Sequence, residues 1–214
     1  MTQNKNNDGF IIEFWSNVFW VLSMISVFFI VKKLKKSMTY AFVEGWVLGN
    51  LIAAILSTLI AYYLGSFVKV LMYFIVIYAV ARVFEVIIYQ LNVLFFDPYR
   101  AEKRGEVYKI KSPTRMVILL LHNYVEIMFW YSSIIIALIQ ISGNHLEASW
   151  GEYVRSNIIC IATFDSSMIQ EILKETFPSL SKIVFLQIIS GLIMTLISLG
   201  RFIGILPSID SIER

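Results

Sequence analysis

The sequence has few charged residues, one cysteine and little proline or glycine. Charged residues make up 15% of the 214 residues, and hydrophobic residues make up 58%. A soluble domain carries about 25% charged and about 45–50% apolar residues. One core cannot bury this apolar excess, which excludes an ordinary soluble enzyme and a disordered chain. The single Cys160 permits no internal disulfide, and only 4 prolines and 10 glycines exclude a low-complexity chain.

Long apolar segments account for most of the sequence. A helix that crosses a bilayer needs about 20 mostly apolar residues. Five segments meet this requirement: 10–31, 40–64, 67–95, 116–141 and 183–206. The sequence therefore predicts an all-α, polytopic membrane protein with five transmembrane helices. The first segment is not a cleaved signal peptide on this interpretation, because its apolar run is too long and its basic cluster follows it.

Two short connections carry most of the basic residues. Residues 32–36 include four lysines, and residues 100–115 include six lysines and arginines. Because lysine and arginine collect in cytoplasmic loops, both connections are expected inside the cell. With five spans, this arrangement predicts a multi-pass protein of the cell membrane with its N-terminus outside and its C-terminus in the cytoplasm.

The connection between the last two spans has a pattern of its own. Ser149 is a helix cap with Glu152 at the third helical position, and the apolar run that follows is too short to span. A polar patch comes next, formed by Thr163, Phe164, Asp165, Ser166 and Ser167. Polar backbone at membrane depth is tolerated only inside protein or beside water. The pattern therefore predicts a re-entrant helix at a cavity or a subunit interface.

From residue 116 onwards the chain resembles the two-helix pore module of the potassium-channel superfamily, in its bacterial ion-channel-like family. The order is an outer helix (116–142), a re-entrant helix with a filter-like segment (149–167) and an inner helix (181–206). The inner helix carries the similar features, which are Leu180-Ser181-Lys182, Gly191 and the run Gly200-Arg201-Phe202-Ile203-Gly204-Ile205-Leu206-Pro207. The resemblance implies a pore-like module at 116–214 and a homotetramer. The three-span region 1–115 is not recognised.

The filter-like segment departs from that family. Potassium filters use successive backbone carbonyls, and their glycines adopt conformations that side chains forbid. This chain has no glycine between Gly151 and Gly191, so we do not expect a carbonyl filter. In a fourfold assembly, Asp165 would form a carboxylate ring with the hydroxyls of Thr163, Ser166 and Ser167 around a wider path. Alternatively, Asp165 caps the following helix, and Phe164 at the axis would block conduction.

Polar residues also occur inside the spans. On the inner helix, Gly191 permits a bend, and polar residues on one face either line water or pack between helices; they are Gln187, Ser190, Thr195 and Ser198. Upstream, two pairs lie three and four residues apart, Arg82 with Glu85 and His122 with Glu126. We interpret these pairs as a polar cluster between helices. The alternatives are a proton-sensing His122–Glu126 pair and a catalytic site, for which all four residues would have to converge around a cavity.

These observations predict an ion-channel-like membrane protein, a weakly selective cation channel with a side-chain-lined pore. The alternative is a non-conducting sensor or partner-binding protein that retains the channel architecture. We expect no enzymatic activity, no metal site and no cofactor other than monovalent cations in a pore. The expected partners are membrane lipids, further copies of the chain and, under the alternative, an unidentified protein; no nucleic acid is expected.

Overall fold

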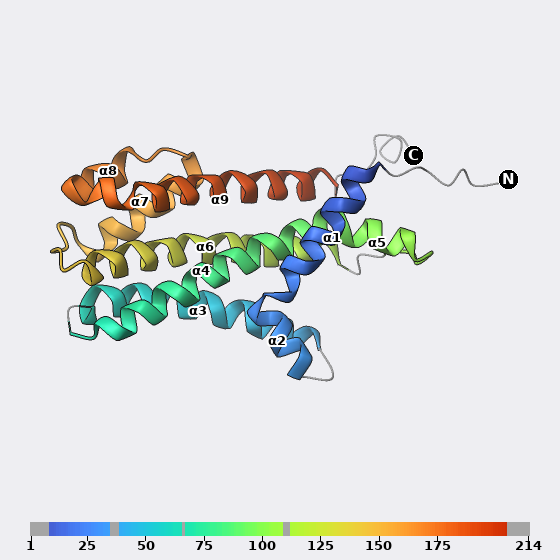
Figure 1. Ribbon diagram of the computed structural model, residues 1–214, viewed down its shortest axis with the longest axis horizontal. Helices are drawn as coiled ribbons and strands as arrows, with labels where there is room; N and C mark the ends of the chain where they lie inside the picture. Colours follow the sequence, from blue (N-terminus) through green and yellow to red (C-terminus); the bar gives the residue numbers. More distant parts are fainter. Residues whose placement is uncertain (1–8, 35–38, 66, 109–111, 205–214) are drawn as a thin grey trace.

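The computed structural model describes residues 9–34, 39–65, 67–108 and 112–204, and every regular element within them is a helix. Four helices carry apolar stretches long enough to cross a membrane (Figure 1), so the chain is an all-helical, multi-pass membrane protein. They are α3 (Tyr40–Leu64), α4 (Lys69–Leu91), α6 (Pro113–Ile141) and α9 (Phe177–Ile203). The predicted end of the inner helix at 205–206 and the lysines 35, 36, 109 and 111 lie outside the described residues.

Shorter elements connect the long helices. α4 continues through the π-helical turn Asn92–Phe96 into α5 (Asp97–Lys103), at the basic connection. Between α6 and α9 lie α7 (Trp150–Thr163), α8 (Ser167–Leu173) and the 3-10 turn Lys174–Thr176. The four predicted segments from residue 40 onwards are therefore found as helices, with ends that differ by a few residues.

Helix α6 is the centre of the bundle and contacts α3, α4, α7 and α9 (Figure 1). Its start is specified by Ser112, whose Oγ accepts from the Arg115 amide at 3.3 Å, and by Pro113 in the first turn. The stretch from Glu126 to Ala137 is buried on nearly all sides. A helix that is buried on all sides lies in the core of its bundle, and the neighbouring helices pack against this part of α6.

The predicted first span is not one continuous helix. It consists of α1 (Phe10–Met24) and α2 (Val27–Leu34), with a break at Ile25 and Ser26. Side chains satisfy amides at the start of α2: Glu85 Oε2 accepts from the Val27 amide at 2.9 Å, and Ser26 Oγ accepts from the Phe29 amide at 3.0 Å. An unbroken helix would bond these amides to its own carbonyls. Within the described residues, four helices are therefore long and apolar enough to cross a membrane, and the first predicted segment is divided between two shorter helices.

The start of α1 lies beside α5. Lys103 Nζ and a Glu13 carboxylate oxygen are 2.5 Å apart, and Arg100 donates to the Ser16 carbonyl at 2.8 Å. Figure 1 shows the start of α1, helix α5 and the end of α9 at one end of the bundle. The first described residues, at the start of α1, and the last, at the end of α9, therefore lie at the same end of the bundle. The orientation of the chain in the membrane stays a prediction.

Candidate functional site

Helix α7 begins as the sequence predicts. Ser149 Oγ accepts from the Glu152 amide at 3.4 Å, and Glu152 Oε2 accepts from the Ser149 amide at 2.8 Å, which completes a capping box. Helix α7 ends at Thr163, where Phe164 adopts a left-handed conformation with φ 61°. The chain then reverses into α8, so α7 and α8 form a hairpin.

The tip of this hairpin lies beside the middle of α9. A Cβ placed on Gly191 would be 2.5 Å from the Ile161 carbonyl oxygen, so only glycine permits this approach. Tyr124 on α6 donates to the same carbonyl at 3.4 Å, and its hydroxyl is 2.9 Å from Thr195 Oγ1 on α9. The hairpin therefore starts at one end of the bundle and turns partway along it (Figure 1).

The predicted filter-like residues form that turn and are largely exposed. Thr163, Phe164, Asp165 and Ser167 are exposed, and Ser166 is half-buried. Asp165 Oδ1 accepts from the Ser167 amide at 2.9 Å, and Asp165 Oδ2 accepts from Ser167 Oγ at 2.9 Å. Ser166, not Asp165, occupies the N-cap position of α8, so Asp165 accepts from the first amide of that helix without being the cap that the alternative assigned to it. The carboxylate ring stays a prediction, because it needs further copies of the chain.

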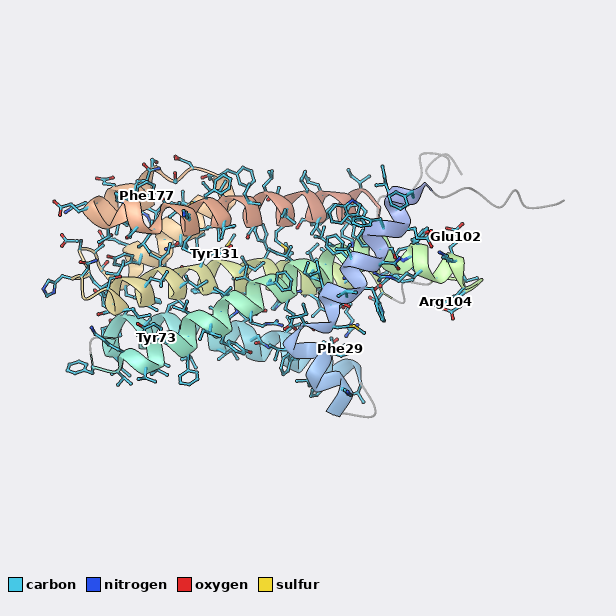
Figure 2. The ribbon with its side chains drawn as sticks, viewed as in Figure 1. Phe29, Tyr73, Glu102, Arg104, Tyr131 and Phe177 are labelled. Atoms are coloured by element: carbon cyan, nitrogen blue, oxygen red, sulfur yellow. The ribbon has the colours of Figure 1, made fainter. Side chains whose placement is uncertain are left out.

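The predicted polar face of α9 packs inward within one chain. Gln187 donates to the Asn157 carbonyl of α7 at 3.0 Å, and Ser190 Oγ is 2.8 Å from the hydroxyl of Tyr131, which is labelled in Figure 2. Ser198 is buried and bonds to the Met194 carbonyl, one turn earlier in α9. Gln187 and Gly191 contact α7, and Ser190 and Thr195 contact α6, so these four residues hold α9 against its neighbours. The packing alternative describes this face, and the water-lining assignment is wrong for the single chain.

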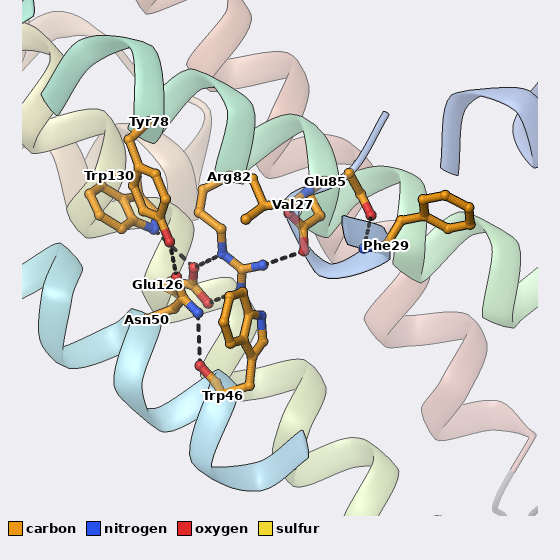
Figure 3. A network of polar contacts seen from close by, with 10 residues as sticks. Val27, Phe29, Trp46, Asn50, Tyr78, Arg82, Glu85, Glu126 and Trp130 are labelled. Atoms are coloured by element: carbon orange, nitrogen blue, oxygen red, sulfur yellow. Dashed lines mark hydrogen bonds and ion pairs between the residues drawn. The ribbon is translucent and has the colours of Figure 1, made fainter. Parts of the chain in front are cut away.

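The intramembrane charges meet as predicted, with one exception. Arg82 Nε and Nη2 donate to Glu126 Oε1 and Oε2 at 2.8 and 3.0 Å, and Arg82 Nη1 donates to Glu85 Oε1 at 2.7 Å (Figure 3). The three residues are 3%, 0% and 4% exposed, in the order Arg82, Glu126, Glu85. Two parallel bonds between a guanidinium and a carboxylate are among the strongest polar contacts in proteins. We call these three residues the ion cluster.

His122 is the exception. Its Nδ1 lies 2.8 Å from the Ile118 carbonyl oxygen on the preceding turn, and its side chain lines a hollow of about 450 Å³ at the bundle surface. Glu126 instead points at Arg82, on the inward side of α6. The predicted His122–Glu126 pair is therefore wrong, because Glu126 bonds to Arg82 and Trp130 while His122 contacts a carbonyl of its own helix.

Sequence reasoning missed the aromatic and amide groups around the ion cluster. Trp130 Nε1 donates to Glu126 Oε1 at 2.9 Å, and the Arg82 guanidinium lies 5.9 Å from the centroid of Trp46 (Figure 3). Tyr78 packs edge-on against Trp130 and donates to Asn50 Oδ1 at 2.7 Å. The spacing of four residues from Glu126 to Trp130 was the available signal, since it places both on one helix face.

A cavity of about 600 Å³ lies between α3, α4 and α6, next to the ion cluster. Arg82, Glu85 and Asn123 line it on that side. Arg115 and Glu44 also line it; their side chains are 2.5 Å apart and partly exposed, at the ends of α6 and α3 near the basic connection. The lining residues come from α3, α4 and α6, from the π-helical turn and from the connection before α6, so no local pattern could have predicted this cavity.

Comparisons with protein-family models, curated proteins and solved structures find no match for this chain. Within the described residues, no group of three or more His, Cys, Asp and Glu side chains is placed to hold a metal ion. The candidate site thus has two parts, the exposed polar turn at 163–167 and the ion cluster with its cavity. The first suits contact with water or hydrated ions, and the second holds charges inside the bundle.

Proposed function

We propose that this chain is one subunit of a channel-like membrane assembly in which the turns at residues 163–167 surround a shared path for cations. The observation that carries the proposal is the exposure of this polar turn beside the middle of α9. Irregular polar backbone at membrane depth is tolerated only where it is buried in protein or faces water. In an assembly, other copies and a water-filled axis would supply both surroundings.

Asp165 is the residue that would attract cations in this arrangement. Its side chain is exposed, although both carboxylate oxygens accept a bond from Ser167. An ionised carboxylate facing lipid is costly, whereas a ring of carboxylates around an aqueous path attracts cations and leaves them hydrated. Selectivity among monovalent cations would then be weak, because no glycine-containing carbonyl strand replaces the water of the ion.

The described chain also supports an orientation. The start of α1, helix α5 and the end of α9 lie at one end of the bundle (Figure 1), and the basic connection between α5 and α6 is at that end. Because short basic loops remain in the cytoplasm, we place this end inside the cell. The hairpin of α7 and α8 then enters from the outside, and both ends of the described chain face the cytoplasm.

One observation favours the non-conducting alternative. Phe164 occupies the tip of the hairpin in a left-handed conformation, with 38% of its surface exposed. If four such side chains met at the axis, they would close it to water. The assembly would then keep a channel-like shape for sensing or for binding a partner.

The test is ion flux through the purified protein in liposomes, with separate potassium, sodium and chloride gradients. Wild-type protein should pass both cations and no chloride. Asp165→Asn should reduce cation flux at least several-fold, because it removes the charge, while asparagine keeps a side-chain oxygen that can accept the bond from the Ser167 amide. Glu171→Gln is the matched control, since it neutralises an exposed carboxylate on α8 away from the turn, and its flux should equal that of wild type.

Two outcomes separate the alternatives. Flux that appears only in Phe164→Ala would assign a plugging role to Phe164 and support the non-conducting form of the wild-type protein. The absence of flux from wild type and from Phe164→Ala would overturn the channel proposal, once size-exclusion chromatography has shown that both proteins are folded and assembled.

A further inference from the structure

The charges that line the cavity beside the ion cluster cancel one another. Two ion pairs form part of its walls, Arg82 with Glu85 on the inner side and Arg115 with Glu44 near the basic connection. An ion that entered would leave water without meeting a counter-charge, which is costly inside an apolar bundle. The cavity therefore favours a neutral occupant.

An acceptor without a partner lies on the inner side of the cavity. Asn123 lines the cavity and is 4% exposed, and its buried Oδ1 atom has no hydrogen-bond partner among the described residues. A buried acceptor without a donor bears the full cost of its lost hydration. The last side-chain torsion of asparagine has broad minima, so a modest rotation of the amide turns Oδ1 toward the cavity. An occupant with an O–H or N–H group would remove this cost.

An apolar wall joins the two ends of the cavity. Leu119 lines it one helical turn after Arg115 and one turn before Asn123, and Val47 and Val86 line it from α3 and α4. The volume of about 600 Å³ is within the range of about 300–1,000 Å³ that small-molecule sites occupy. It is far larger than the share of about 30 Å³ that one water molecule takes, so the cavity suits an apolar body better than a single water.

We propose that this cavity binds a neutral molecule with an apolar body and a hydroxyl or N–H donor at one end, such as a phenol or an alcohol. The donor would bond to Asn123 Oδ1, and the apolar body would lie along Leu119 and Val86. The proposal is independent of the pore, because it requires neither an assembly nor the turn at residues 163–167.

The experiment compares two probes that share one apolar body, 4-butylphenol and 4-butylanisole. The phenol is neutral at pH 7 and donates a hydrogen bond, whereas the methyl ether only accepts one. Binding to the full-length protein in detergent is measured by equilibrium dialysis, and partition into protein-free micelles is subtracted. The phenol should bind saturably and about tenfold more tightly than the anisole, equivalent to about 1.4 kcal/mol. The 4-butylbenzylammonium ion, a charged donor on the same body, should bind several-fold more weakly than the phenol.

Asn123→Leu tests the assigned acceptor. It keeps a side chain of similar size and leaves no unsatisfied polar atom at this position, so the fold should be preserved. In this variant the phenol should lose its advantage and bind as weakly as the anisole. Asn144→Leu is the matched control, because Asn144 is exposed in the connection after α6, and it should preserve the advantage of the phenol.

Leu119→Trp gives a second test that leaves Asn123 in place. Leu119 is half-buried at the cavity wall, so an indole there occupies space that the apolar body needs, and binding of both probes should fall several-fold. This variant decides the question if Asn123→Leu does not fold. Equal affinity of wild type for phenol and anisole, tighter binding of the ammonium ion, an advantage of the phenol that survives in Asn123→Leu, or unchanged binding in Leu119→Trp would each overturn the proposal. The absence of saturable binding, which is the result expected if water alone fills the cavity, would overturn it as well.

Discussion

The ion cluster and the turn at residues 163–167 are two polar regions of one apolar bundle, and they are satisfied in opposite ways. In the ion cluster, the charges of Arg82, Glu85 and Glu126 bond to each other and are at most 4% exposed. In the turn, the carboxylate of Asp165 accepts bonds from Ser167, two residues away, and the side chain stays exposed. A region that is satisfied within one chain needs nothing further, whereas an exposed polar turn needs water or another subunit.

The difference extends to the elements that each region anchors. Glu85 bonds to the start of α2, so the ion cluster fixes the break between α1 and α2. The hairpin of α7 and α8 is fixed from its inner side, by the contact of Ile161 with Gly191 and by Tyr124. We therefore expect changes in the ion cluster to act on folding, and changes in the exposed residues of the turn to act on flux.

The largest expected effect is the loss of one partner from the ion cluster. Glu126→Ala removes the two carboxylate acceptors of Arg82 Nε and Nη2 and the acceptor of Trp130, and leaves the buried guanidinium with Glu85 alone. Breaking a buried pair in this way costs about 3–5 kcal/mol. The measurement is the free energy of unfolding by denaturant titration in mixed micelles.

The control for this prediction is Arg104→Ala, which breaks the pair of Arg104 with Glu106. Both of its side chains are mostly exposed, at 59% and 60%, and such pairs add little stability because solvent screens them. Equal destabilisation by the two variants would contradict the division between a satisfied core cluster and a solvent-screened surface pair.

A smaller effect is expected where the hairpin meets α9. Gly191→Ala places a Cβ 2.5 Å from the Ile161 carbonyl oxygen, so the hairpin has to shift away from α9. Overpacking of this kind costs about 1–3 kcal/mol, measured by the same titration. Gly49→Ala, on α3, meets nothing within 4 Å and should be neutral or stabilising by up to about 1 kcal/mol. A Gly191→Ala protein as stable as Gly49→Ala would mean that the hairpin does not press on α9.

Local patterns predicted the long helices and the start of α7 because their causes are local. Apolar length specifies a membrane-spanning helix, and Ser149 with Glu152 specifies a cap within four residues. The polar groups of Arg82, Glu85 and Glu126 were predicted to cluster because charges inside apolar segments have to find partners.

The features that sequence reasoning missed depend on distant residues. The break after α1 is stabilised by Glu85, which is 58 positions from its partner Val27. The apolar pattern of residues 10–31 carries no sign of that partner, so it predicts one continuous span. The face of α9 with Ser190 and Thr195 was ambiguous, since hydroxyl groups suit both water and helix packing, and the hydroxyls of Tyr131 and Tyr124 on α6 decide between them. The cavity is formed by three helices and has no linear signature.

The smallest effect is expected at the start of α7, and it depends on pH. The Ser149 amide and hydroxyl both donate to the Glu152 carboxylate, which lowers its pKa from the ordinary value of 4.5. A carboxyl group whose pKa is lowered by folding adds stability above its unfolded pKa, and this contribution is lost as the pH falls through the folded pKa. The melting temperature of Glu152→Ala should therefore be below that of wild type at pH 7, and the two should converge as the pH falls below 4.5.

Glu171→Ala, which removes an exposed carboxylate from α8 and leaves the capping box intact, should follow the wild-type profile. A difference between Glu152→Ala and wild type that stays constant down to the lowest pH would assign the loss to helix propensity, and the start of α7 would then depend less on its charged cap than the break at α2 depends on Glu85.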